Sequence, residues 1–216
     1  MSMPAWEIAL NTYWVKYASK ISARDKMYRF AQYFSRMVYF QMEQSGAPKE
    51  SVAWVKHISK TASTGRKFIR LGKFIDIWYK AYKHLAKHSV SLTSEKDLIN
   101  CLGIMALIAD MIFYVWDFLR WFEEAKIFQF NMNVKYKRTL WNAIRYGIKA
   151  VRYTLMLRTE KKDSKAFFSH RRLAIKSAID FMNPMKGLKY NSLNDGQIGL
   201  LGVVTSCISM YDDFAK

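Results

Sequence analysis

Apolar positions recur at helical spacing in the first half of the chain. Between Ser22 and Ser45 they return every three or four residues, with arginine and glutamine on the opposite side, and the pattern stops at a Ser-Gly-Ala-Pro turn. Ser22 and Asp25 have the spacing of a capping box. The segment is predicted to be an amphipathic helix, and residues 6–21 form a further helix candidate.

A second amphipathic helix is predicted from about Ser63 to His88. Seven Lys or Arg accompany a single acid, Asp76, between Thr64 and Lys87, and large apolar residues occupy one stripe of the pattern. Gly72 falls in the middle, where glycine costs about 1 kcal/mol against alanine. We therefore expect Gly72 to permit close packing with another helix.

The most apolar long run extends from Leu98 to Phe122 and is interrupted by Asp110 and Asp117. Favourable insertion of its apolar residues into a membrane is nearly balanced by the cost of the two carboxylates. The run is either a membrane span whose carboxylates face other helices or a buried helix of a bundle. Pairing of both carboxylates with Lys and Arg is favoured over a proton relay.

The second half of the chain combines a basic region with an uncharged C-terminal segment. Residues 135–176 contain thirteen Lys or Arg against two acids, whereas residues 196–211 contain no charge. Gly196, Gly199, Gly202 and Ser206 are small enough to allow close helix contact within a membrane, although the segment is short for a straight span.

These patterns predict an all-α fold of five to seven helices, with one or two hydrophobic membrane segments. We expect a single membrane-associated domain over residues 1–216. Its parts are amphipathic basic helices (1–95), an apolar helix (96–124), basic helices (134–182) and a Gly-rich C-terminal membrane segment (196–211).

The formal net charge of +18 predicts an anionic partner. An anionic membrane, a nucleic acid and an acidic protein all satisfy that requirement. The seven Trp and thirteen Tyr suit a membrane interface. The aromatic residues have the spacing of helix cores, and no recognised nucleic-acid motif accompanies them. The membrane is therefore favoured, and no nucleic-acid partner is expected.

Motifs that would indicate catalysis or a metal are not found. The chain contains no GxGxxG, P-loop or HExxH pattern, and its two cysteines stand far apart. His84 and His88 are four residues apart, but no carboxylate or cysteine lies nearby in sequence to complete a metal site. We expect a protein that is not an enzyme and holds no cofactor and no metal.

Three blocks together resemble the peroxin-eleven family of peroxisomal membrane-elongation proteins. The block ARDKMYRFAQY (23–33) is similar to the family's N-terminal helix, TGRKFIRLGK (64–73) to its most recognisable motif, and LNDGQIGLLGVVTS (193–206) to its Gly-rich C-terminal segment. The segments YVWDFLRW (114–121) and IKSAID (175–180) also fit. Ala23 stands where glycine is usual, and Glu123 and Glu124 interrupt a stretch that is usually apolar.

The resemblance implies a protein of the peroxisomal membrane (the glycosomal membrane in a kinetoplastid) that elongates the organelle and promotes its proliferation and fission. It implies self-association and recruitment of a fission adaptor and a dynamin-related GTPase. A metabolite pore, with Asp110 and Asp117 facing water, and a soluble module that binds nucleic acid or acidic protein are the alternatives.

Amphipathic helices that enter one leaflet would supply the membrane-shaping mechanism. The residues expected to contact lipid headgroups are Arg24, Lys26, Arg29, Arg36, Arg66, Lys67, Arg70 and Lys73. The expected membrane-inserting face consists of Met27, Phe30, Phe34, Met37 and Val38. Helix packing is assigned to Gly72, Gly196, Gly199, Gly202 and Ser206, and contact between copies to Gly199, Gly202 and Ser206.

Overall fold

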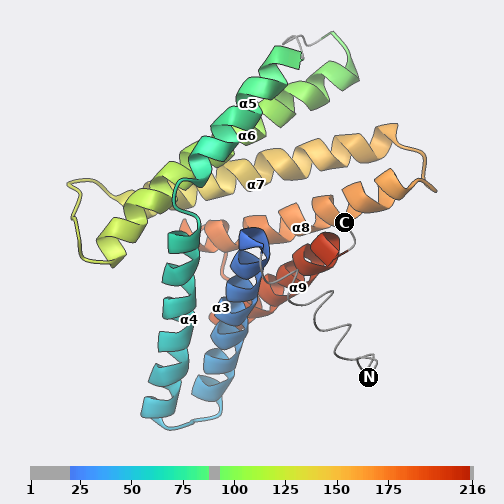
Figure 1. The fold of residues 1–216 in the computed structure, drawn as a ribbon. Coiled ribbons are helices and arrows are strands. Elements are labelled where there is room, and N and C mark those ends of the chain that lie inside the picture. Colours follow the sequence, from blue (N-terminus) through green and yellow to red (C-terminus); the bar gives the residue numbers. More distant parts are fainter. Residues whose placement is uncertain (1–19, 88–92, 215–216) are drawn as a thin grey trace, which may run out of the picture. The chain divides into compact units, whose positions relative to one another are not determined.

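The structure is a computed structural model that describes residues 20–87 and 93–214. Within these residues the chain forms seven helices and no strand, as the sequence predicts. They are α3 (Ile21–Gln44), α4 (Lys49–Ile69), α5 (Lys73–Lys87), α6 (Glu95–Glu124), α7 (Val134–Thr159), α8 (Lys165–Gly187) and α9 (Asp195–Phe214) (Figure 1). The expected helix over residues 6–21 lies almost wholly outside the described residues.

Contacts between residues divide the chain into two compact units, where the sequence predicts a single domain. The first unit contains α3, α4 and α9, and the second contains the helices between residues 70 and 194. In the first unit α3 packs against both α4 and α9 (Figure 1). The last helix of the chain is thereby joined to the first described helix.

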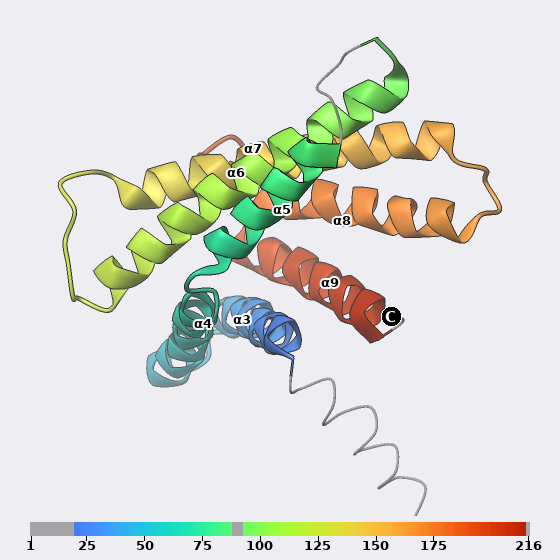
Figure 2. The ribbon, with the colours of Figure 1, turned by 45° about the horizontal axis from the view of Figure 1, so that its top comes forward.

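The second unit is a row of helices in which each packs on the next in chain order. α6 packs between α5 and α7, and α7 packs between α6 and α8 (Figure 2). Short connections of residues 125–133 and 160–164 join the last three helices of the row. α6 is the one helix in the described part of the chain that is long and apolar enough to cross a membrane. α9, which covers the expected C-terminal membrane segment, is not.

The prediction of one helix from Ser63 to His88 is wrong in two respects: Ser63 lies inside α4, which already begins at Lys49, and the helix does not continue unbroken to His88. α4 ends at Ile69 and α5 begins at Lys73, and Gly72 between them has a φ of +76°. A Cβ at Gly72 would point into open space, so no close helix contact requires a glycine at this position. Gly72 supplies the left-handed backbone that ends a helix rather than a close helix contact.

The prediction of a capping box at Ser22 is also wrong. α3 begins at Ile21, its N-cap Lys20 makes no side-chain cap, and Asp25 instead accepts a hydrogen bond from Arg66 Nε at 3.1 Å. A capping box does form at the start of α6, where Ser94 accepts from the Asp97 backbone N–H and the Asp97 carboxylate accepts from the Ser94 backbone N–H. The turn predicted at Ser45–Pro48 is confirmed, with Gly46 at a φ of +71°.

Candidate membrane interface

α5 presents three different faces around its axis. Ile77 and Ala81 are buried, whereas five large apolar side chains on an adjoining face are 47–61% exposed. We call this set the α5 apolar face: Ile75, Trp78, Tyr79, Tyr82 and Leu85. Since a soluble helix buries its apolar stripe, an apolar face this exposed indicates a surface that contacts something apolar.

The remaining face of α5 is polar and mostly basic. Asp76, Lys80 and Lys83 are exposed, and Lys83 Nζ lies 4.4 Å from the centre of the Tyr79 ring. The Trp78 and Tyr82 rings stack with centres 6.2 Å apart. Lysines beside stacked aromatic rings have the composition of helices that lie in a membrane interface.

An apolar groove lies between α5 and α6. Its volume is ≈ 460 Å³. We call it the α5–α6 groove, and its lining consists of Phe74, Ile75, Trp78, Met111, Ile112, Val115 and Trp116. The groove joins the α5 apolar face to α6, whose Met105 and Ile108 are also exposed. The apolar surface of the second unit therefore extends over two helices.

The opposite side of α6 is held by buried ion pairs at Asp117. This carboxylate is 2% exposed, and it accepts from Arg70 Nη1 at 3.1 Å and from Arg138 Nε at 2.5 Å. Arg70 is itself buried and lies directly before the α4–α5 break. Asp117 therefore fastens the start of α5 and the start of α7 to the same turn of α6.

Asp110 forms a second set of ion pairs two turns earlier on α6. Lys149 Nζ lies 2.6 Å from one of its carboxylate oxygens, and Arg145 Nη1 lies 3.4 Å from the other. The Arg145 guanidinium also lies 3.6 Å from the centre of the Phe113 ring. The prediction that both aspartates pair with Lys and Arg is confirmed. A pore lined by these two carboxylates would need them to face water, and here both are buried.

The cations predicted on α3 to contact lipid mostly have partners on α9. Arg29 is buried and donates to Thr205 Oγ1 at 2.8 Å, Arg36 pairs with Asp195 at 2.9 Å, and Lys26 pairs with Asp213. Arg24 is exposed.

The basic cluster at the end of α4 is likewise engaged within the chain. Arg66 contacts Asp25 and donates to Gln32 Oε1 at 2.7 Å, and Lys67 is only 4% exposed and lies 3.3 Å from Ser63 Oγ. Lys73, the first residue of α5, lies 5.1 Å from the centre of the Tyr114 ring. In this conformation the cluster joins helices rather than presenting a charged surface.

The predicted inserting face of α3 is divided between exposed and covered positions. Phe34 is 45% exposed and stacks with Phe30 at 5.8 Å between ring centres. Met27 and Val38 are half-buried. Met37 lies against α9, where its backbone N is 2.6 Å from the position a Cβ would take at Gly199. Phe34 is therefore the one residue of this predicted face whose side chain is exposed.

The small residues of α9 pack inside the chain against α3. A Cβ at Gly202 would lie 2.1 Å from the Tyr33 ring, and one at Gly196 would lie 2.4 Å from the Phe40 ring. Ser206 is fully buried and donates to the Gly202 carbonyl at 2.6 Å. Gly196, Gly199 and Gly202 make the close helix contact that their size predicts, with α3 as the partner. Contact between copies through them stays a prediction.

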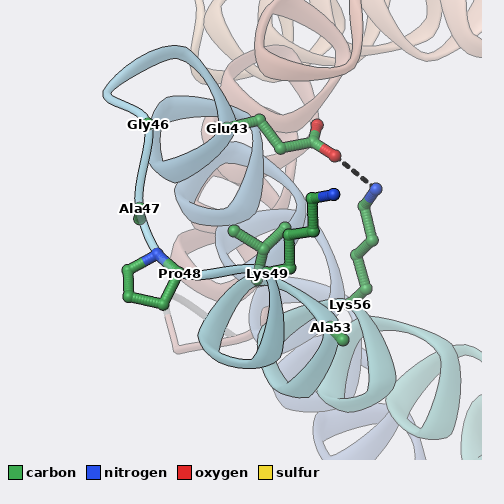
Figure 3. Close-up of a pocket in the computed structure, with 8 residues that line it drawn as sticks. Glu43, Gly46, Ala47, Pro48, Lys49, Ala53 and Lys56 are labelled. Carbon is green, nitrogen blue, oxygen red and sulfur yellow. Dashed lines mark hydrogen bonds and ion pairs between the residues drawn. The ribbon is translucent and has the colours of Figure 1, made fainter.

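A surface hollow lies at the α3–α4 turn. Its volume is ≈ 680 Å³, and Figure 3 shows Glu43 and Lys56 paired across it beside Gly46, Ala47 and Pro48. Glu43 and Lys56 neutralise each other, and the remaining lining is the turn with Lys49, Val52 and Ala53 of α4, so the hollow offers one further charged group and no set of groups that would select a ligand. No cluster of His, Cys, Asp or Glu that could hold a metal occurs among residues 20–87 and 93–214.

Tyr39 gives the α3–α9 contact a measurable pH dependence. Its hydroxyl donates to Asp195 at 2.5 Å, and burial, followed by this hydrogen bond, raises the pKa of Tyr39 to about 12. The neutral hydroxyl is favoured in the folded state, so its stabilisation is present below the unfolded pKa near pH 10 and is lost as the pH approaches 12. We expect the difference in unfolding free energy between the wild type and Tyr39→Phe to shrink over that window.

The measurement is denaturant unfolding of both proteins at a series of pH values. Lysines titrate in the same range but are common to both proteins, so the difference isolates Tyr39. A difference that stays constant from about pH 9 to pH 12 would contradict the assignment.

Sequence reasoning missed the α5–α6 groove and the division of α4 from α5. The stripe on residues 64–87 was visible, but a stripe does not say which of its residues a neighbouring helix covers. Gly72 was the available signal for the break, because glycine is the residue most often found in the left-handed position after a helix.

The described part of the chain defines a helical protein that has one helix, α6, long and apolar enough to cross a membrane, and an exposed apolar face on α5. The sequence model of the family described as "Peroxisomal biogenesis factor 11 (PEX11)" matches residues 12–167 and 156–214. The chain belongs to this family, which confirms the resemblance found in the sequence. Its members are peroxisomal biogenesis factors.

A curated relative supports the same assignment. "Peroxisomal biogenesis factor 11" of Schizosaccharomyces pombe is 22% identical over 214 residues, which cover 89% of this chain and 90% of the relative. No solved structure matches the chain.

Proposed function

We propose that this protein elongates the peroxisomal membrane by laying the α5 apolar face and the adjoining surface of α6 into one leaflet. The single observation that supports this most strongly is the exposure of five large apolar side chains on α5 beside Lys80 and Lys83. Apolar side chains that enter the headgroup region widen one leaflet and favour curvature, while lysines attract anionic lipid at about 1 kcal/mol each.

The ion pairs of α6 support a position along the membrane surface rather than across it. Crossing would carry Asp110 and Asp117 into the hydrocarbon together with Arg138, Arg145 and Lys149 of α7. Insertion scales assign about 2.5–3.5 kcal/mol to each such charge at the centre of a helix. A surface position lets α7 and its many cations stay in water and near headgroups.

The proposal extends to the partners and residues that the family resemblance implies. We propose that Phe34 and Phe30 of α3 also enter a leaflet, with Arg24 near the headgroups. Self-association and recruitment of a fission adaptor and a dynamin-related GTPase would follow elongation.

Replacing Trp78 and Tyr82 together with glutamate tests the α5 surface. The full-length double variant is expected to lose at least tenfold in binding to anionic vesicles, since two apolar side chains of about 1.5–3 kcal/mol each would become charged. The measurement is flotation with vesicles with and without anionic lipid, followed by electron microscopy of vesicle shape.

The matched control is Trp54→Glu with Tyr190→Glu, which makes the same two changes at side chains that are 67% and 75% exposed on α4 and after α8. The control should bind and tubulate vesicles like the wild type. Equal losses in both variants would argue against α5 as the inserting surface. A wild-type chain that stays in solution beside anionic vesicles would instead favour a soluble binder of acidic protein or nucleic acid.

A further inference from the structure

We infer that the α5–α6 groove holds one acyl chain of an anionic phospholipid, whose headgroup lies at Lys137. This inference rests on the proposed membrane position of α5 and α6 and assigns a specific lipid site within it. The occupant we commit to is a phospholipid of the bilayer rather than a soluble ligand.

The chemistry of the groove selects an apolar chain. All its lining side chains are apolar or aromatic, and its volume of ≈ 460 Å³ falls within the range of about 300–1,000 Å³ usual for small-molecule sites. Ile75 and Trp78 are more than half exposed, so the groove is accessible from outside the helix pair. A polar ligand would leave its hydrogen-bonding groups unsatisfied against this lining.

The size of the groove favours a lipid tail over a partner helix. A helix with its side chains is about 10–12 Å across, and grooves that bind one offer several anchor pockets at one-turn spacing. The α5–α6 groove instead lies between two helices whose rings meet nearby, with Phe74 and Phe118 in edge contact at 6.0 Å. An apolar groove of ≈ 460 Å³ between two packed helices suits a single flexible chain.

The charge beside the groove selects an anionic headgroup. Lys137 is exposed, and its Nζ lies 5.2 Å from the centre of the Trp116 ring, which lines the groove. No acid occurs in the sequence between Glu124 and Glu160, and Lys135, two residues before Lys137, is also exposed. A flexible lysine acts as a point charge for phosphate or carboxylate, so a lipid with its tail on Trp116 would place an anionic headgroup within reach of Lys137.

The test uses full-length protein in phosphatidylcholine vesicles that carry traces of phosphatidylserine with a photoreactive diazirine in one acyl chain. Mass spectrometry of the irradiated protein should find adducts on the peptides that contain Trp78 and Ile112. Ile112→Trp should lower this labelling about tenfold, because the added ring occupies the space of the acyl chain in a close-packed site. Ile175→Trp is the matched control, with the same change at an exposed position of α8, and it should label like the wild type.

The headgroup is tested by two lysine variants whose side chains are both exposed. Lys137→Gln should lower labelling by the phosphatidylserine probe about fivefold, towards the level of a phosphatidylcholine probe, which is the change that one lysine near an anionic lipid confers. Lys135→Gln should change it much less. Equal effects of the two variants would overturn the assignment of Lys137.

The inference and the proposed function fail in different ways. Protein that floats with vesicles but shows no groove adduct, or equal labelling of Ile112→Trp and Ile175→Trp, would overturn the lipid site alone. Competition by free fatty acid but not by excess unlabelled phosphatidylserine would overturn the choice of a phospholipid. Protein that does not float would overturn the membrane position and the site together.

Discussion

Replacing Gly199 with alanine is expected to lower the free energy of unfolding by about 3 kcal/mol, the upper end of the usual cost of overpacking. The new Cβ would lie 2.6 Å from the Met37 backbone N and 2.8 Å from its Cα. A flexible side chain could move away, but a backbone inside α3 cannot do so without displacing the helix. Alanine gains about 1 kcal/mol over glycine in a helix interior, and that gain is too small to offset the clash.

The matched control is Gly65→Ala in α4. There the nearest atom to a new Cβ is in the Tyr28 ring at 3.8 Å, an ordinary van der Waals contact, so the same substitution should be neutral or stabilising by up to about 1 kcal/mol. Denaturant unfolding of both variants, followed by circular dichroism, measures the difference. If Gly199→Ala is as stable as Gly65→Ala, α9 does not pack on α3 through its glycines.

Replacing Asp117 with asparagine is expected to destabilise the second unit by about 3–5 kcal/mol. The shape of the side chain is nearly kept, but the negative charge that faces Arg70 and Arg138 is removed. Arg70 has a side chain that is only 7% exposed, so its charge would stay buried after losing the attraction of the Asp117 carboxylate. Breaking one side of a buried pair costs far more than breaking a pair at the surface.

Asp76→Asn provides the control, because Asp76 is exposed on the polar face of α5 and a surface change of this kind usually alters stability by less than about 0.5 kcal/mol. Unfolding of both variants and hydrogen exchange of α5 give the comparison. Protection of α5 should fall in Asp117→Asn because Arg70 fastens the start of that helix. Equal stability of the two variants would show that the Asp117 pairs contribute little.

Prediction from the sequence succeeded where the signal was local and periodic. The helices over residues 22–45 and 196–211 form close to the expected bounds. Residues spaced three and four apart lie on one face only when the segment is an α-helix, so the pattern predicts that conformation. The pairing of Asp110 and Asp117 was also predicted correctly. A carboxylate in an apolar run must find a cation, and the chain supplies many.

Prediction failed where two local signals competed, or where packing by a distant segment determined which side chains are buried or paired. Arg29 and Arg36 look like solvent-facing cations on an isolated helix, and only the packing of α9 engages them with Thr205 and Asp195. Asp25 has capping-box spacing, but its carboxylate instead accepts a hydrogen bond from Arg66, which is 41 residues away. At Gly72 the apolar stripe favoured a continuous helix, whereas the backbone breaks there.

The sequence by itself determined the helical class, the family, and the basic and apolar character of this protein, because these depend on residue type and spacing alone. The tertiary structure decided which side of each stripe is covered. It buried the glycine face of α9 and the cations of α3 against each other, and it left the α5 apolar face exposed. The physical reason is that burial depends on a partner far along the chain, and helix periodicity carries no information about that partner.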